Sequence, residues 1–115
     1  MPRNQRHVSI EVLQTSTTEV TSGTAEQDRD SSTAESLELW VDVTAETSMD
    51  FDFIIETSID GTNFVVQQTI SNVTAVGAQA IAISRVDDPL GTTVRARWVR
   101  TAGSATFSIS LVRRE

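Results

Sequence analysis

Apolar and polar residues alternate one by one along several short stretches of this chain, and that alternation restricts the folds open to it. A period of two is typical of β-strands with one buried and one exposed face. The clearest stretch is SLELWVDVT, residues 36–44. Its expected inward row is Leu37, Leu39, Val41 and Val43, and its expected outward row is Glu38, Trp40, Asp42 and Thr44.

The same alternation predicts further strands along the rest of the chain. One is residues 50–57, with Phe51, Phe53 and Ile55 inward and Asp50, Asp52 and Glu56 outward. The next two are residues 62–70, with Phe64, Val66 and Ile70 on one face, and residues 78–84. The last two are residues 92–100, with Val94, Ala96 and Trp98 inward, and residues 105–112, with Ala105, Phe107, Ile109 and Leu111 inward. A weaker strand is expected at residues 7–13, with Val8, Ile10 and Val12 in register.

Turn-forming residues separate these stretches. Asp60-Gly61 between apolar runs is a strong hairpin signal. A loop is expected at residues 72–77 and a wide turn at 87–91, and Ala102-Gly103-Ser104 is expected to turn the chain back. Seven or eight short strands without helical periodicity predict an all-β fold, a single antiparallel β-sandwich of jelly-roll type.

The chain of 115 residues fits one domain. We expect residues 1–115 to form a single β-sandwich, with a polar N-terminal arm at 1–8. Residues 15–36 are rich in Ser, Thr, Asp and Glu, and Val20 is their only large apolar residue. They are expected to form a long polar loop with one short strand, the alternative being an arm that orders only on binding.

Composition argues against several function classes. The chain has no cysteine and one histidine, so disulfides, thiolate chemistry and a zinc site within one chain are not expected, and neither is any other metal or cofactor. A net charge of −7 is poorly suited to phosphate neutralisation, so no nucleic-acid partner is expected. No apolar run approaches the ~18 residues of a membrane span, and no signal peptide is apparent.

Candidate catalytic and calcium sites are weak. Asp50, Asp52, Asp60, Asp87 and Asp88 could supply oxygen ligands to Ca²⁺, but no run matches an EF-hand, and Asp60 is explained by its turn. Asp52 and Glu56 lie four residues apart on one strand, about 13 Å, which exceeds the spacing of glycosidase carboxylates. A Ser-His-Asp triad and a P-loop are not apparent, so no enzyme activity is expected.

Two stretches go beyond generic β pattern, FIIETSIDGTNF at residues 53–64 and VRARWVRTAGSATFSISL at 94–111. Together with LELWVDVTA they resemble a family of small β-sandwich virion structural proteins of tailed phages and prophages. The resemblance covers residues 37–112, about two-thirds of the chain, and departs at Phe64, where the family commonly has tryptophan. It implies a capsid decoration protein or a head–tail or tail accessory protein, with no catalytic residues.

The candidate interface residues are Trp40, Arg95, Arg97, Arg113 and Arg114. Trp40 falls on the polar face of its strand, where a large aromatic can anchor a partner, unless both faces of the strand are covered or a bulge shifts the register. All nine basic residues are arginine. One expected strand carries three of these arginines, Arg95, Arg97 and Arg100. They either bind an acidic partner or pair across strands with Glu38, Asp42, Asp52 or Glu56. The tail carrying Arg113 and Arg114 is expected to be free for contact.

The expected function is a capsid decoration (cement) protein that binds and stabilises the lattice of the major capsid protein. It would be made in the host cytoplasm and lie on the capsid exterior of the virion. Lattice axes favour a closed homo-oligomer, a trimer before a dimer. One alternative is a tail, adaptor or baseplate accessory protein that binds tail proteins. Another is a carbohydrate-binding attachment module, which the low aromatic content of 5% disfavours.

Overall fold

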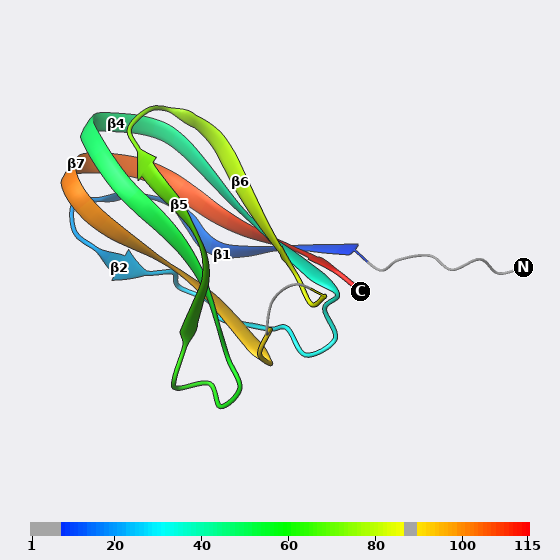
Figure 1. Cartoon of the computed structure of the whole chain (residues 1–115). Helices are drawn as coiled ribbons and strands as arrows, with labels where there is room; N and C mark the ends of the chain where they lie inside the picture. The colour runs from blue at the N-terminus through cyan, green and yellow to red at the C-terminus, as the bar shows by residue number, and fades with distance from the viewer. Residues whose placement is uncertain (1–7, 87–89) are drawn as a thin grey trace, which may run out of the picture.

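In a computed structural model, residues 8–86 and 90–115 are described and form an all-β domain without helix in that part of the chain (Figure 1). Seven strands form one antiparallel sheet, which confirms the all-β, antiparallel expectation. In chain order they are β1 (Val8–Glu19), β2 (Gly23–Thr24), β3 (Arg29–Asp30), β4 (Ser36–Ser58), β5 (Val65–Val73), β6 (Gly77–Ser84) and β7 (Thr93–Arg114). Among the described residues, no helix has the length and apolar character needed to cross a membrane.

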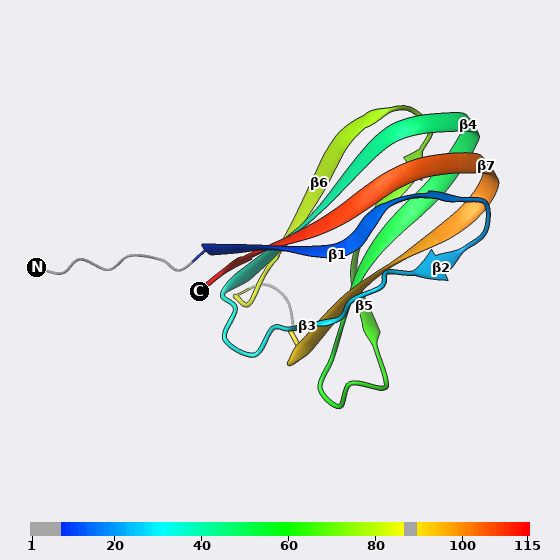
Figure 2. The same cartoon turned by 180° about the vertical axis from the view of Figure 1, so that it is seen from behind.

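The sheet is a jelly roll because β4 and β7, with 23 and 22 residues, are about four times as long as a typical strand and take part in both of its halves. In the first half the order is β1, the C-terminal part of β7, the N-terminal part of β4, and β6. In the second half β2 and β3 pair with the N-terminal part of β7, which pairs with the C-terminal part of β4, which pairs with β5. Strands β2 and β3 follow each other along the same edge of β7 and so fill one strand position. Two layers of four strand positions connected in this way are the jelly-roll arrangement, and Figures 1 and 2 show the long β4–β7 ribbon curving from one layer to the other.

The two layers are joined by a bend in the β4–β7 ribbon. Three register shifts fall together there, between Val43 and Phe51 of β4, and bulges of this kind bend a strand and strengthen its twist. Ser48 on one strand and Gly103 on the other have left-handed backbone, with φ of 49° and 71°. The expectation that residues 102–104 turn the chain back is therefore wrong, because β7 continues through them into the other layer.

The core lies between the layers and is built from the predicted inward rows of β4 and β7. Their apolar side chains are almost fully buried: Leu37, Leu39, Val41, Val43, Phe51, Phe53, Ile55, Val94, Ala96, Trp98, Ala105, Phe107, Ile109 and Leu111. Phe107 is central, because its ring lies 4.9 Å from that of Phe53 and 5.0 Å from that of Trp98, both edge-to-face. Such geometry is favourable for aromatic pairs.

The N-terminal third differs most from expectation. Val8, Ile10 and Val12 are 44%, 73% and 47% exposed, whereas Leu13 is fully buried, because β1 bulges twice after Val12 and changes which residues face the core. The expected polar loop at 15–36 holds the end of β1 and the short strands β2 and β3. Residues 1–7 of the expected arm, and 87–89 of the expected wide turn, lie outside the described residues.

Two further differences concern β5 and its hairpin. The return strand begins at Val65 and not at residue 62. Phe64 and Val66 do not share the core with Ile70: Phe64 is half-buried and Val66 is 46% exposed, whereas Ile70 is buried. The cause is a bulge between the Ile55–Gln68 and Glu56–Val66 pairs, which changes the face of the residues before it.

Candidate protein-binding face

The outer surface of the first layer carries outward side chains that are mostly small or apolar. One row across the four strands is Val12, Ser110, Trp40 and Ala80, and the next row is Ile10, Val112, Glu38 and Ala82. We call the surface formed by these outward residues, together with Val8, the Trp40 face. Trp40 lies inside it, on a strand that has neighbours on both sides.

Of the two tryptophans, Trp40 lies outside the core. Its side chain is 43% exposed, whereas Trp98 is buried, so the expected outward position of Trp40 is correct. The indole Nε1–H donates to Oε1 of Glu38 at 3.0 Å. This bond, with a second from Arg114, lowers the pKa of Glu38. The carboxylate therefore holds the indole in one orientation, which reduces the entropy that the ring would lose on meeting a partner.

An exposed apolar row on β1 extends the face beside Trp40. Val8, Ile10 and Val12 keep much of their surface in water and lie on the same side of the sheet as Trp40. The sequence pattern predicts a strand for these residues but does not indicate that they are exposed. The signal was present in Leu13 and Gln14, which break the alternation after Val12 and mark the bulge.

Arg95 and Arg97, two of the candidate interface residues, are paired within the chain. Both donate from Nε to the carboxylate of Glu56, each at 2.8 Å, and the Arg95 guanidinium lies 3.9 Å from the centre of the Phe64 ring. Burial raises the pKa of Glu56, but hydrogen bonds and charge from Arg97 and Arg95 outweigh that and lower it. Glu56 thus faces outward as expected but is 3% exposed, because the two arginines cover it.

Arg113 and Arg114 are not free, contrary to expectation, because β7 stays paired with both β1 and β4 up to Arg114. Arg114 Nε binds Oε2 of Glu38 at 3.0 Å, at the margin of the Trp40 face. Arg113 points to the other side of the sheet, where it makes an ion pair with Glu11 at 3.6 Å. Among the candidate residues, only Arg114 is brought close to Trp40, and it is linked through Glu38.

Arg85 has a structural role that the sequence pattern did not show. Its guanidinium donates to the carbonyl oxygens of Ala34, Ser31 and Leu90, at 2.7, 3.0 and 3.4 Å. It thereby fastens the segment before β4 to the segment before β7. An arginine that satisfies three main-chain carbonyls is not distinguished by sequence from one on an open surface.

The acidic residues considered for metal or catalysis are otherwise occupied. Asp60 accepts hydrogen bonds from the backbone of Asn63 and Thr62 and from the Ser58 hydroxyl, and these bonds, led by that of Asn63, lower its pKa strongly. Asp50 and Asp52 bind the side chain and backbone of Asn72. Within the described residues no group of three or more potential ligands could hold a metal ion; Asp87 and Asp88 lie outside them.

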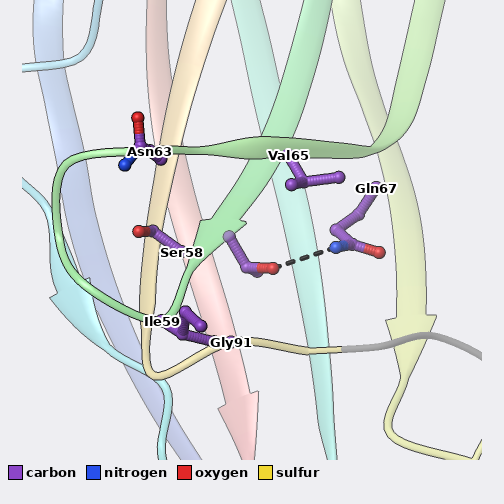
Figure 3. A pocket seen from close by; sticks show the side chains of 7 residues that line it. Ser58, Ile59, Asn63, Val65, Gln67 and Gly91 are labelled. Carbon is purple, nitrogen blue, oxygen red and sulfur yellow. Dashed lines mark hydrogen bonds between the residues drawn. The ribbon is translucent and has the colours of Figure 1, made fainter.

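A pocket lies between the β4–β5 hairpin and the segment leading into β7 (Figure 3). Its volume is about 200 Å³, and its lining includes Ile59, Val65 and Gly91. Gln67 closes one side by donating to the Thr57 hydroxyl at 2.9 Å. Ligand sites for small molecules are usually about 300 Å³ or larger, so this hollow suits one side chain of a partner better than a cofactor.

Comparison with known proteins gives a fold and no family. No family model matches the chain, and no curated protein matches it. Among solved structures, VP2 of infectious bursal disease virus in a subviral particle has a TM-score of 0.68 at 12% identity, over 96% of this chain and 33% of that one. A T13 particle of the same virus gives 0.63 at 12% identity, over 96% of this chain and 31% of that one.

The PBSX exported protein XepA is also similar, with a TM-score of 0.65 at 15% identity, over 91% of this chain and 36% of that one. The chain spans about a third of the length of these proteins. At such low identity the likeness shows the fold alone: this chain shares its β-fold with a protein from a viral particle and with an exported protein.

Proposed function

We propose that the chain is a virion structural protein of a tailed phage or prophage, and that it acts as a decoration protein on the exterior of the capsid. The sequence resemblance to small virion proteins supports this role. The jelly-roll fold, shared with VP2 of a subviral particle, is compatible with it. The partner would be the major capsid protein, and the chain would act by binding and without catalysis.

The observation that carries the proposal is the Trp40 face. A sheet surface with an oriented, 43% exposed tryptophan has the features of a protein-binding surface, because buried tryptophans contribute about 2 kcal/mol or more at the centres of interfaces. Exposed Ile10 and Val12 extend the apolar area on one side, and on the other side Ala80 and Ala82 provide only small side chains. Small side chains allow close approach of a second backbone or sheet.

The mechanism is mass action on the assembled shell. A protein that binds the lattice but not the separate capsid subunits stabilises the shell by RT ln(1 + [L]/Kd) for each site, about 2.7 kcal/mol when its concentration is a hundred times Kd. Many sites acting together make loss of subunits from the shell less favourable. The domain needs only a rigid surface for this role, which the two-layer core provides.

The carbohydrate-binding alternative has little support from the aromatic residues. Sugar rings are commonly bound by several exposed aromatic faces, whereas in the described structure the rings of Phe51, Phe53, Trp98 and Phe107 are buried. Phe64 is half-buried and covered by Arg95. Trp40 alone would have to provide the stacking surface.

The proposal is tested by binding the purified chain to capsid shells that lack it. We expect Trp40→Ala and Ile10→Ala to weaken shell binding, with Trp40→Ala weakening it about 30-fold or more. The matched control is Val66→Ala, which removes an exposed apolar side chain on β5, outside the face, and should bind as the unchanged protein does. Unchanged binding by both face variants would overturn the assignment of this face.

A further inference from the structure

Asp42 lies beside Trp40 on the outward side of β4. One inward residue separates them, which places the two about 7 Å apart along the strand, and both side chains are exposed. In this layer β4 runs between β6 and β7, as Figure 2 shows. Asp42 is therefore held within the sheet, at the border of the Trp40 face.

The carboxylate of Asp42 has no hydrogen-bond or ion-pair partner in the described part of the chain. Its cross-strand neighbours are a serine of β7 and an alanine of β6. The other acidic residues of β4 are all hydrogen-bonded or ion-paired within the chain: Glu38, Glu46, Asp50, Asp52 and Glu56. Because Glu38 and Arg114 neutralise each other, Asp42 leaves one uncompensated negative charge beside Trp40.

A partner that covers Trp40 also removes water from Asp42, because the two side chains are neighbours on one strand. A carboxylate that loses its water without gaining a hydrogen-bond donor strongly opposes binding. The chain itself offers no donor to Asp42 among the described residues, so the donor must come from the partner. The strongest donors to a carboxylate are the cationic side chains of arginine and lysine.

The exposed indole favours the same kind of group. Tryptophan is the aromatic side chain that binds cations best, with the cation within about 6 Å of the ring centre. The hydrogen bond to Glu38 holds the Trp40 ring in one orientation, and a cation over that ring can reach Asp42 at the next outward position. The net charge of −7 also attracts a basic surface and repels an acidic one.

We propose that a basic side chain of the partner protein, an arginine or a lysine, lies over the Trp40 ring and pairs with Asp42. This inference rests on the proposed binding role of the Trp40 face and names the chemistry that the face recognises. Asp42 is then a specificity-determining residue. It favours a basic contact surface on the partner over a neutral or acidic surface of the same shape, on which its carboxylate would stay unpaired.

The first test measures binding of the full chain to capsid shells that lack it, at low and high salt. Asp42→Asn should weaken binding about tenfold or more and make it less dependent on salt, since a charge pair is lost. Asp42→Glu keeps the charge and should retain most of the affinity. The matched control is Asp28→Asn, which changes the net charge equally at an exposed position between β2 and β3 and should bind as the unchanged chain does.

These variants separate the inference from the proposed function. If Asp42→Asn binds shells as tightly as the unchanged chain while Trp40→Ala binds weakly, the face is correct and the basic side chain is wrong. Equal weakening by Asp42→Asn and Asp28→Asn would also overturn the inference, because only the net charge would then matter. Asp42 has no partner in the described fold, so its substitution should leave the stability of the domain unchanged.

A second test needs no shell. NMR of the full chain follows the indole Nε1–H signal of Trp40 during titration with acetyl-glycyl-arginyl-glycine amide at millimolar concentrations, and with the matched glutaminyl peptide. We expect a larger shift with the arginyl peptide, and we expect Asp42→Asn, but not Asp28→Asn, to remove the difference. That result for a chain that does not bind shells would support this inference and contradict the decoration function. Equal shifts with the two peptides would overturn the inference whatever the shells show.

Discussion

Gly103 lies directly against the main-chain carbonyl of Ser48 at the bend where β4 and β7 pass from one layer to the other. A Cβ built on Gly103 would collide with the Ser48 and Thr47 carbonyl oxygens, and the backbone there has a φ of 71°. Glycine is thus required for two independent reasons, conformation and space. The jelly roll depends on this contact, because the long ribbon must fold over here to enclose a core.

Gly103→Ala should lower the free energy of unfolding by about 3 kcal/mol, the sum of left-handed backbone strain and the collision. Gly61→Ala is the control, since Gly61 has a similar φ of 76° but open space around its Cα, and it should cost about 1 kcal/mol. Urea denaturation of both variants measures the difference. Equal losses would mean that the two strands do not approach each other closely at the bend.

Glu56→Gln should destabilise the fold by about 2–3 kcal/mol at neutral pH, because it leaves two arginines without their carboxylate. Loss of one partner from a buried ion pair usually costs more, but Arg95 and Arg97 are 30% and 31% exposed, and water compensates for part of the loss. Urea denaturation of both proteins measures the difference. Gln67→Glu is unsuitable as a control, because it would add a charge close to Glu56. Gln68→Ala, at an exposed position of β5, is the control and should have little effect.

The effect of Glu56 also has a pH dependence whose sign follows from its lowered pKa. A carboxyl group whose pKa is lower in the folded state stabilises the fold above its unfolded pKa of about 4.3, and this stabilisation is lost as pH falls through the folded value. The gap in stability between the unchanged protein and Glu56→Gln should therefore be full at pH 7 and shrink below about pH 4. A gap that widens on acidification would contradict the ion-pair assignment.

Phe107→Ala should cost about 3–5 kcal/mol, since Phe107 is fully buried and its ring, from the first layer, packs against the Phe53 and Trp98 rings of the second layer. The fluorescence of Trp98 should change in the folded variant, because the Trp98 ring would lose its edge-to-face neighbour. Val66→Ala, at a 46% exposed position, should have an effect below about 1 kcal/mol. A small loss for Phe107→Ala would mean that the layers are not held together at this ring.

Trp40→Ala should change the stability of the isolated domain by less than about 1 kcal/mol, because the indole is exposed and makes one hydrogen bond, to Glu38. The pKa of Glu38 should rise in this variant, since that hydrogen bond stabilises the carboxylate. Thermal unfolding and NMR titration of the Glu38 carboxyl group measure the two effects. A variant that fails to fold would place Trp40 in the core and end its role as an interface anchor.

The strands of β4 and β7 were predictable because strict alternation from Leu37 to Val43 and from Ala105 to Leu111 leaves one possible buried face. The bend was misread as a turn, since Ala102-Gly103-Ser104 has the composition of both a hairpin turn and a bulged corner. Only the partner strand decides between them. The β4 bulge at Ser48 and Met49 lies opposite Gly103 of β7, and neither segment alone predicts that pairing.

The candidate site was predicted in part. The outward position of Trp40 followed from alternation, but exposure of Ile10 did not, because two bulges in β1 change its register after Val12. The sequence leaves two roles open for the arginines, contact with a partner or cross-strand ion pairs. In the structure Arg95 and Arg97 form cross-strand ion pairs with Glu56. Charge patterns cannot locate such pairs, because register depends on bulges in both strands.

Quantitative mass spectrometry of purified virions, combined with cryo-electron microscopy, tests the central proposal most directly. We expect a copy number comparable with that of the major capsid protein, and density on the outer capsid surface with the Trp40 face turned toward the lattice. A few copies at the tail would contradict decoration in favour of a tail accessory role. Absence of the chain from the particle would contradict a virion structural function altogether.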